Sequence, residues 1–77
     1  MKIKILLFGQ LAETLGSKEL QLEGYGDTVS LITALHQQFP LLATSKYVVA
    51  VNQEMISGNT SLTENSIVAL LPPFSGG

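Results

Sequence analysis

The sequence predicts a single α+β domain in which one main helix packs on one face of a mixed sheet of about five strands. Three observations indicate this fold class. Short segments rich in β-branched residues are separated by turn residues, one longer segment has helical periodicity, and 77 residues suffice for only one small core. No internal repeat or linker divides the chain, so we expect residues 1–77 to form one domain.

The first part of the chain predicts a strand, a short helix and a second strand. Residues Lys2–Phe8 alternate with period two and are rich in isoleucine and leucine, which is typical of a strand. Helix formers over Gln10–Leu15 predict one or two helical turns that end at Gly16. Residues Glu19–Glu23 alternate again and predict the second strand.

The main helix is expected after the turn residues that follow the second strand. Asp27 or Thr28 can cap its first turn, because either side chain can accept a hydrogen bond from a free backbone N–H group. Pro40 cannot continue the helix, which should therefore end near Gln38 or Phe39. Apolar residues at helical spacing predict the stripe that faces the sheet. This stripe contains Val29, Leu31, Ile32, Leu35 and Phe39.

The second half of the chain predicts three more strands. Residues Tyr47–Val51 are mostly β-branched and predict a buried strand, and Asn52-Gln53 predicts a tight turn into a short strand over Glu54–Ile56. Residues Ile67–Leu71 predict the last strand.

The segment before the last strand completes the predicted fold. Leu62 is expected to return to the core, and Asn65 to occupy a turn, because asparagine tolerates a positive φ. The predicted order is strand, strand, helix, strand, short strand, strand. This order is typical of the β-grasp, or ubiquitin-like, roll.

Because one helix covers only one face of such a sheet, the alternation of side chains decides what the other face presents. The first and last strands should turn Ile3, Ile5, Leu7, Val68 and Leu70 toward the helix. The same alternation predicts an apolar patch on the open face, formed by Leu6, Phe8, Met55 and Leu71. Such a patch favours a protein interface. Loops folded over it, or a core on both faces of the sheet, are the alternatives.

Composition excludes several classes of protein. The chain is 45% hydrophobic and 13% charged, which excludes a disordered chain. Its net charge of −2 and the absence of arginine give no basic cluster for nucleic acid. The longest apolar run, Ile67–Leu71, is far below the ~20 residues of a membrane span, and the amino end does not resemble a signal peptide. Since cysteine is also absent, we expect a cytoplasmic protein.

The side chains alone do not predict a metal site or a self-sufficient active site. His36 is the only histidine and there is no cysteine, so the usual zinc ligands are missing. No serine is paired with a base, and the glycines do not form a phosphate-binding GxxxxGK loop. We expect no metal, no bound cofactor and no catalytic site belonging to this chain.

The tail over residues 72–77 has an unusual composition. Pro72 and Pro73 cannot continue a strand ladder and keep the chain extended. Phe74 is suited to anchor in a partner's groove. The two terminal glycines can enter a narrow site that any Cβ would block. A frayed terminus or a cloning remnant is the alternative for Gly-Gly alone, but the residues before it favour a functional tail.

Four segments together resemble the small subunit of molybdopterin synthase. They are Ala50-Val51-Asn52-Gln53, Leu62-Thr63, Val68-Ala69 and Pro72-Pro73-Phe74-Ser75-Gly76-Gly77. The likeness covers the whole chain. The last segment is specific to this family, whereas a Gly-Gly end alone is not. By these motifs the chain is similar to the MoaD type of sulfur carrier in the MoaD/ThiS family, whose members have a ubiquitin-like fold.

This resemblance implies a sulfur carrier of molybdenum cofactor biosynthesis. In the family, an E1-like adenylating enzyme uses ATP in trans to adenylate the terminal glycine, and sulfur then replaces the adenylate to leave a thiocarboxylate. The large subunit of molybdopterin synthase receives the tail and uses the sulfur to build the dithiolene from a pyranopterin precursor. The implied partners are this large subunit in a heterotetramer, the adenylating enzyme, and a sulfurtransferase or other sulfur donor.

The resemblance also assigns roles to particular residues. Gly77 would carry the sulfur, and Gly76 would permit entry of the tail into the partner. The positions that would pack against partners are Phe8, Met55, Leu71 and Phe74. Two departures from the family pattern affect partner contacts and leave the tail chemistry intact. They are Ala12-Glu13, where the family often has Arg-Glu, and Asn65-Ser66-Ile67, where it often has Gly-Asp-Glu.

Three other functions remain open for such a chain. A sulfur carrier of the thiamine pathway shares the fold and the Gly-Gly end, but that family typically lacks the Pro-Pro pair. A protein modifier would join its C-terminus to lysines, as ubiquitin does. A plain interaction module would carry Gly-Gly without using it.

Overall fold

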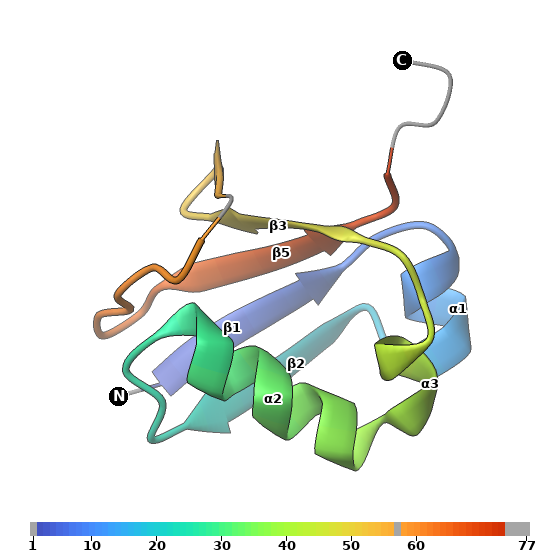
Figure 1. The fold of residues 1–77 in the computed structure, drawn as a ribbon, viewed down its shortest axis with the longest axis horizontal. Helices are drawn as coiled ribbons and strands as arrows, with labels where there is room; N and C mark the ends of the chain where they lie inside the picture. Colours follow the sequence, from blue (N-terminus) through green and yellow to red (C-terminus); the bar gives the residue numbers. More distant parts are fainter. Residues whose placement is uncertain (1, 57, 74–77) are drawn as a thin grey trace.

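The computed structural model describes residues 2–56 and 58–73. In chain order the elements are β1 (Lys2–Leu7), α1 (Gln10–Leu15), β2 (Glu19–Glu23), α2 (Thr28–Gln38), α3 (Pro40–Ala43), β3 (Val48–Val51), β4 (Glu54–Met55) and β5 (Ile67–Leu71). The strands form one sheet in the order β2-β1-β5-β3-β4 (Figure 1). Strands β1 and β5 run parallel, and the other neighbouring strands are antiparallel. The predicted β-grasp fold is confirmed.

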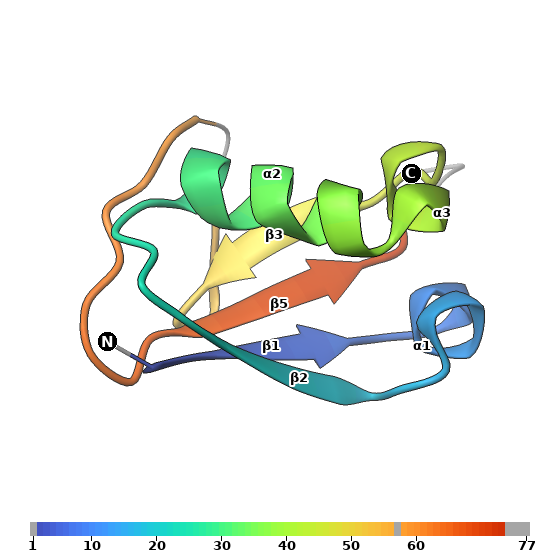
Figure 2. The same ribbon diagram turned by 90° about the horizontal axis from the view of Figure 1, so that it is seen from below.

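Helix α2 lies across one face of the sheet, and no helix in the described part of the chain covers the opposite face (Figure 2). The helix begins where the sequence predicts, because the side chain of Asp27 accepts a hydrogen bond from the backbone N–H of Ser30 at 3.1 Å. It ends at Gln38, just before Phe39 and Pro40. The molecule therefore has two layers, with one sheet face left open.

The core lies between α2 and the sheet, where the predicted inward-facing residues are found. Fully buried side chains from β1 and β5 are Ile3, Ile5, Val68 and Leu70, and Leu7 is almost so. Leu62 also reaches this core, as predicted. The predicted registers of β1 and β5 are therefore correct, since a shift by one residue would exchange the two faces.

The predicted apolar stripe of α2 is partly wrong. Leu31 and Leu35 are fully buried, but Val29 is 56% exposed and Thr28 is buried in its place. Thr28, Leu31 and Leu35 follow the i, i+3, i+7 spacing of one helix face, whereas Val29 is turned by about 100° from Thr28. Pattern alone did not reveal this rotation, because the threonine is satisfied by a loop distant in sequence: the backbone N–H of Thr60, between β4 and β5, donates to Thr28 Oγ1 at 2.9 Å.

The sequence did not predict α3. Pro40 ends α2 but begins α3, because proline fits the first position of a helix, where no N–H donor is needed. Helix α3 turns Leu42 into the core, where its side chain is fully buried. It also leads the chain from the end of α2 back to the sheet (Figure 2).

The turn between β3 and β4 is built by Asn52 and Gln53, as predicted. Both have positive φ, 50° and 72°, which is typical of the tight turns that suit the twist of a hairpin. Asn52 also holds the turn against β5. Its backbone N–H donates to the carbonyl oxygen of Ile67 at 2.8 Å, and its Oδ1 accepts from the N–H of Ile67 at 3.0 Å. Asn65 has the expected positive φ of 66°.

Candidate functional site

The open face of the sheet carries the predicted apolar patch. Leu6, Phe8, Met55 and Leu71 line one hollow of about 360 Å³ on this face, together with Ala50, Gln53, Ile67 and Ala69. Phe8 and Met55 are 44% and 62% exposed, so neither loops nor a second core cover the patch within the described part of the chain. The side chains that alternation predicts on this face are thus brought together.

Strand register explains why this surface is hollow. Leu6 lies opposite Ala69, Ala69 opposite Ala50, and Ala50 opposite Met55, which gives one row across four strands. The two alanines are small and form the floor, while the larger side chains at the ends of the row form the rim. A surface of this shape can receive a protruding apolar side chain of a partner.

Ile67 belongs to the patch but was missed from the sequence. It is 38% exposed and lines the same hollow. Ile67, Ala69 and Leu71 point to the same face of β5, so the alternation that placed Leu71 outward also identifies Ile67. Ile67 is also one of the three residues that the resemblance singles out at 65–67, and of these it alone lines the hollow.

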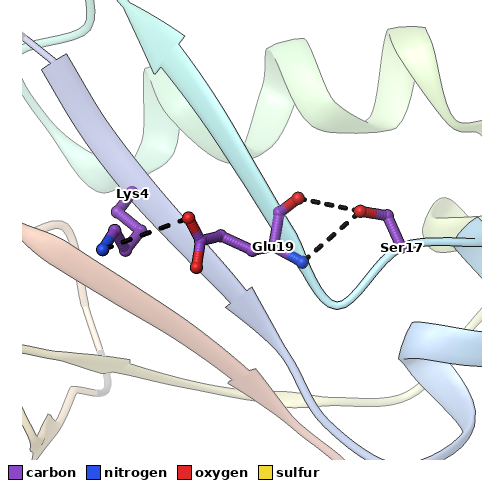
Figure 3. A network of polar contacts seen from close by, with 3 residues as sticks. All are labelled: Lys4, Ser17 and Glu19. Atoms are coloured by element: carbon purple, nitrogen blue, oxygen red, sulfur yellow. Dashed lines mark hydrogen bonds and ion pairs between the residues drawn. The ribbon is translucent and has the colours of Figure 1, made fainter.

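The patch is bordered by charged residues on the side of β2. Lys4 and Glu19 form an exposed ion pair with Nζ and Oε2 4.0 Å apart (Figure 3). Ser17 fixes the backbone of Glu19, because its Oγ donates to the carbonyl oxygen at 2.8 Å (Figure 3). An exposed pair of this kind contributes little to stability. Its position next to Leu6, which lies opposite Glu19, marks where the apolar surface ends.

A second hollow of about 580 Å³ adjoins the patch at Phe8. It is lined by residues of β1, α1 and β2, including Ala12 and Glu13 of α1, and by Lys18, which precedes β2. The resemblance also singles out Ala12-Glu13, and both residues line this second hollow beside the patch.

The tail leaves the sheet next to the patch. Leu71 is the last residue of β5 and lines the patch, and Pro72 follows it directly. The predicted site residues Phe74, Gly76 and Gly77 lie outside the described residues. One strand therefore carries part of the patch and leads straight into the tail (Figure 1).

No cluster of three or more His, Cys, Asp or Glu side chains that could hold a metal ion occurs within residues 2–56 and 58–73. His36 Nε2 lies 2.6 Å from the hydroxyl oxygen of Tyr47, so the histidine joins α2 to the start of β3. Burial raises the pKa of the Tyr47 hydroxyl above its usual range. Among the helices described, none is both long enough and apolar enough to cross a membrane.

Comparison with known proteins relates this fold and tail to one family. The model of the ThiS family matches residues 5–77. The molybdopterin synthase sulfur carrier subunit of Escherichia coli (strain K12) is 32% identical over 80 residues, which cover 97% of this chain and 99% of that protein.

Solved structures agree on the fold. SAMP1 from Haloferax volcanii has a TM-score of 0.81 and 26% identity, with all of both chains covered. A chain in the complex of subunits 1 and 2 of the molybdopterin-converting factor from Helicobacter pylori has a TM-score of 0.74 and 22% identity, also over all of both chains. At 22% identity this last likeness concerns the fold alone. The match to the family model and the full-length relative lead to the same conclusion: the chain belongs to the ThiS family.

Proposed function

We propose that this chain is the sulfur carrier subunit of a molybdopterin synthase and that its last residue, Gly77, carries the sulfur. The observation on which the proposal rests is that β5 lines the apolar patch and leads directly into the tail. The full-length likeness to the Escherichia coli sulfur carrier subunit supports it. A partner that binds the patch would hold the tail at a fixed starting point relative to its own active site.

The proposed chemistry begins with activation of the Gly77 carboxylate in trans. A carboxylate is a poor electrophile, and the sequence has no GxxxxGK loop that would bind ATP. In the activating enzyme, a carboxylate oxygen of Gly77 attacks the α-phosphorus of ATP and pyrophosphate leaves. A hydrosulfide equivalent then attacks the carbonyl carbon of the acyl adenylate, AMP leaves, and Gly77 carries a thiocarboxylate.

The thiocarboxylate then donates its sulfur inside the large subunit. Sulfur passes to the pyranopterin precursor, water restores the carboxylate, and the carrier is ready for another cycle. Gly76 and Gly77 have no side chains to obstruct a narrow channel. We propose that Phe74 anchors the tail in that channel.

The proposed partners use different parts of the chain. The large subunit would cover Phe8, Met55 and Leu71 in a heterotetramer, and an E1-like enzyme would recognise the same face before the tail is charged. A sulfurtransferase or another donor would supply the sulfur. We propose a cytoplasmic location, because the proposed reactions consume ATP and reduced sulfur.

A second candidate is a ubiquitin-like modifier whose C-terminus is joined to lysines of other proteins. It is favoured by the likeness to SAMP1 at 26% identity, since this protein is a small archaeal modifier. Both candidates require an acyl adenylate at Gly77. They differ in the next nucleophile, which is sulfur for the carrier and a lysine amine for the modifier.

The test is mass spectrometry of the intact chain and its C-terminal peptide after incubation with an activating enzyme, ATP and a sulfur source. We expect sulfur to replace one oxygen at Gly77. Because oxidation of Met55 adds nearly the same mass, the thiocarboxylate must be located on the peptide or trapped by alkylation. Gly77→Ala should keep the fold and lose sulfur transfer. A wild-type tail that no activating enzyme modifies would overturn the proposal, and isopeptide-linked products in cells would favour the modifier.

A further inference from the structure

Gly9 lies at the corner between β1 and α1, against the ring of Pro72 at the start of the tail. A Cβ atom placed on Gly9 would lie 2.7 Å from Cγ of Pro72, 3.6 Å from Cδ and 4.0 Å from Cβ. The first distance is below the 3.0 Å that real Cβ contacts respect. Since the proline ring is stiff, any side chain at residue 9 would displace Pro72 or the corner itself.

The backbone at Gly9 also requires glycine. Its φ of 59° and ψ of −136° lie in a region that side chains strongly disfavour. Hydrogen bonds on both sides fix this conformation. The N–H of Phe8 donates to the carbonyl oxygen of Leu70 at 3.2 Å, and the N–H of Ala12 donates to the carbonyl oxygen of Gly9 at 3.2 Å.

The contact distinguishes Gly9 from the other described glycines with positive φ. Gly16 and Gly24 have φ values of 73° and 91°, and a Cβ on either would meet nothing within 4 Å. These two serve turn geometry alone. Gly9 combines a positive φ, in a region more strongly disfavoured for side chains than the left-handed conformation of Gly16, with close contact to the first residue of the tail.

Pro72, which is half-buried, and Pro73, which is exposed, border a hollow on another side. Both line this hollow of about 350 Å³ together with Gln10, Leu11 and Thr14 of α1 and with Ser45 and Lys46, which precede β3. Proline fixes its own φ, so the direction of the chain at this point depends on few torsions. The contact between Gly9 and Pro72, together with the end of β5, determines where the chain leaves the sheet.

We propose that Gly9 is a positioning residue for the C-terminal tail: its bare α-carbon seats Pro72 and so sets the direction in which the tail extends toward a partner's active site. This inference rests on the proposed sulfur-carrier function for its consequence and on the contact with Pro72 for its geometry. A side chain at residue 9 would misalign the terminal carboxylate with ATP while leaving the apolar patch in place. Misplacement by about 1 Å can slow a reaction by about a hundredfold.

The experiment compares four variants in ATP-dependent adenylation by the activating enzyme. We expect Gly9→Ala to lower kcat by about tenfold or more and to change KM by less than about twofold, since recognition by the patch is retained. Gly16→Ala is the control for an alanine at positive φ, because its Cβ would touch nothing within 4 Å, the tail included; the backbone strain particular to residue 9 is separated by the double-mutant cycle below. This control should change neither constant by more than about twofold. Urea denaturation checks that each variant is folded at the assay temperature.

A double-mutant cycle tests whether Gly9 acts through Pro72. Pro72→Ala removes Cγ and Cδ and leaves Cβ, which is in ordinary contact at 4.0 Å. In this background we expect Gly9→Ala to have no further effect on kcat beyond about twofold. An equal loss of kcat in both backgrounds, or a loss no larger than that of Gly16→Ala, would overturn the proposal.

Two further outcomes are also decisive. If Gly9→Ala alone does not fold, circular dichroism should show a larger folded fraction for the double variant, because only the backbone strain at residue 9 then remains. An equal folded fraction in the two variants contradicts the contact. If no activating enzyme adenylates the wild type, the proposed function fails. Urea denaturation of the wild type, Gly9→Ala, Pro72→Ala and the double variant still measures the coupling between residues 9 and 72. Additive stability changes would then reject the contact by itself.

Discussion

Asn52 shows how one residue can hold the apolar patch in shape. Its positive φ forms the turn, and its two hydrogen bonds to Ile67 join the β3–β4 hairpin to β5. Met55 lies on this hairpin and Ile67 on β5, so the two bonds fix one side of the hollow relative to the other. The asparagine in the Ala-Val-Asn-Gln segment therefore has a physical role.

We expect Asn52→Gly to lower the free energy of unfolding by about 1 kcal/mol, because glycine keeps the positive φ but loses the bond from Oδ1 to the N–H of Ile67. Asn52→Ala should lower it by about 1 kcal/mol more, since alanine also disfavours this φ. Urea denaturation of the three proteins measures both steps. Equal stability of wild type and Asn52→Gly would mean that the side-chain bond contributes nothing.

Asp27 gives stability a pH dependence at the residue scale. Hydrogen bonds from Ser30, and next those from Asn59, lower the pKa of the Asp27 carboxyl. Since the pKa in the folded state lies below the unfolded value of about 3.9, the ionised carboxylate adds stability above that pH. This contribution is lost as the pH falls through the folded pKa.

We therefore expect the difference in unfolding free energy between wild type and Asp27→Asn to be constant above about pH 5 and to shrink below about pH 4. Asparagine is a suitable reference, because it can still cap the helix but stays neutral at every pH. Urea denaturation at several pH values measures this difference. If the difference were independent of pH, the hydrogen bonds of Asp27 would not favour its charged form.

At the scale of elements, strands were easier to predict than helices. Each residue of a strand has only two possible faces, and the isoleucines of β1 identify the buried one. A helix can rotate continuously against the sheet, so the pattern could not show that Thr28 rather than Val29 faces inward. The short helix α3 escaped prediction, because a proline that ends one helix carries no sign that it also begins another.

Substitution of Leu42 tests whether α3 packs into the core. We expect Leu42→Ala to lower the free energy of unfolding by about 2–5 kcal/mol, because its side chain is fully buried. Leu41→Ala is the matched control in the same helix, since Leu41 is 62% exposed and should change stability by less than about 0.5 kcal/mol. Equal effects in urea denaturation would mean that α3 does not pack as described.

At the scale of the whole molecule, the sheet separates two tasks. One face packs against α2 and stabilises the fold (Figure 2). The other face presents the apolar patch, and Leu71 of this patch directly precedes the tail. Alternation predicted Leu6, Phe8, Met55 and Leu71 on this second face. Alternation could not predict the hollow itself. Only the strand register shows that Ala69 pairs with Ala50 and that two small residues therefore form its floor.

This separation predicts that binding can be weakened without loss of the fold. Met55 is 62% exposed on the patch, so Met55→Lys should keep the midpoint of urea denaturation within error while it places a charge where an apolar partner surface would lie. We expect the Kd for the large subunit to rise by about tenfold or more, which corresponds to about 1.4 kcal/mol. Calorimetric titration measures this change.

Leu41→Lys is the matched control for this experiment. Leu41 is as exposed as Met55, but it lies on α3, apart from the open face of the sheet. Both variants add the same charge and remove an apolar side chain of similar size, so they differ in position alone. Equal losses of affinity would indicate that net charge, not the apolar patch, governs recognition. If only Met55→Lys lowers the affinity, the partner binds the open face of the sheet, where Leu71 at the end of β5 directly precedes the tail.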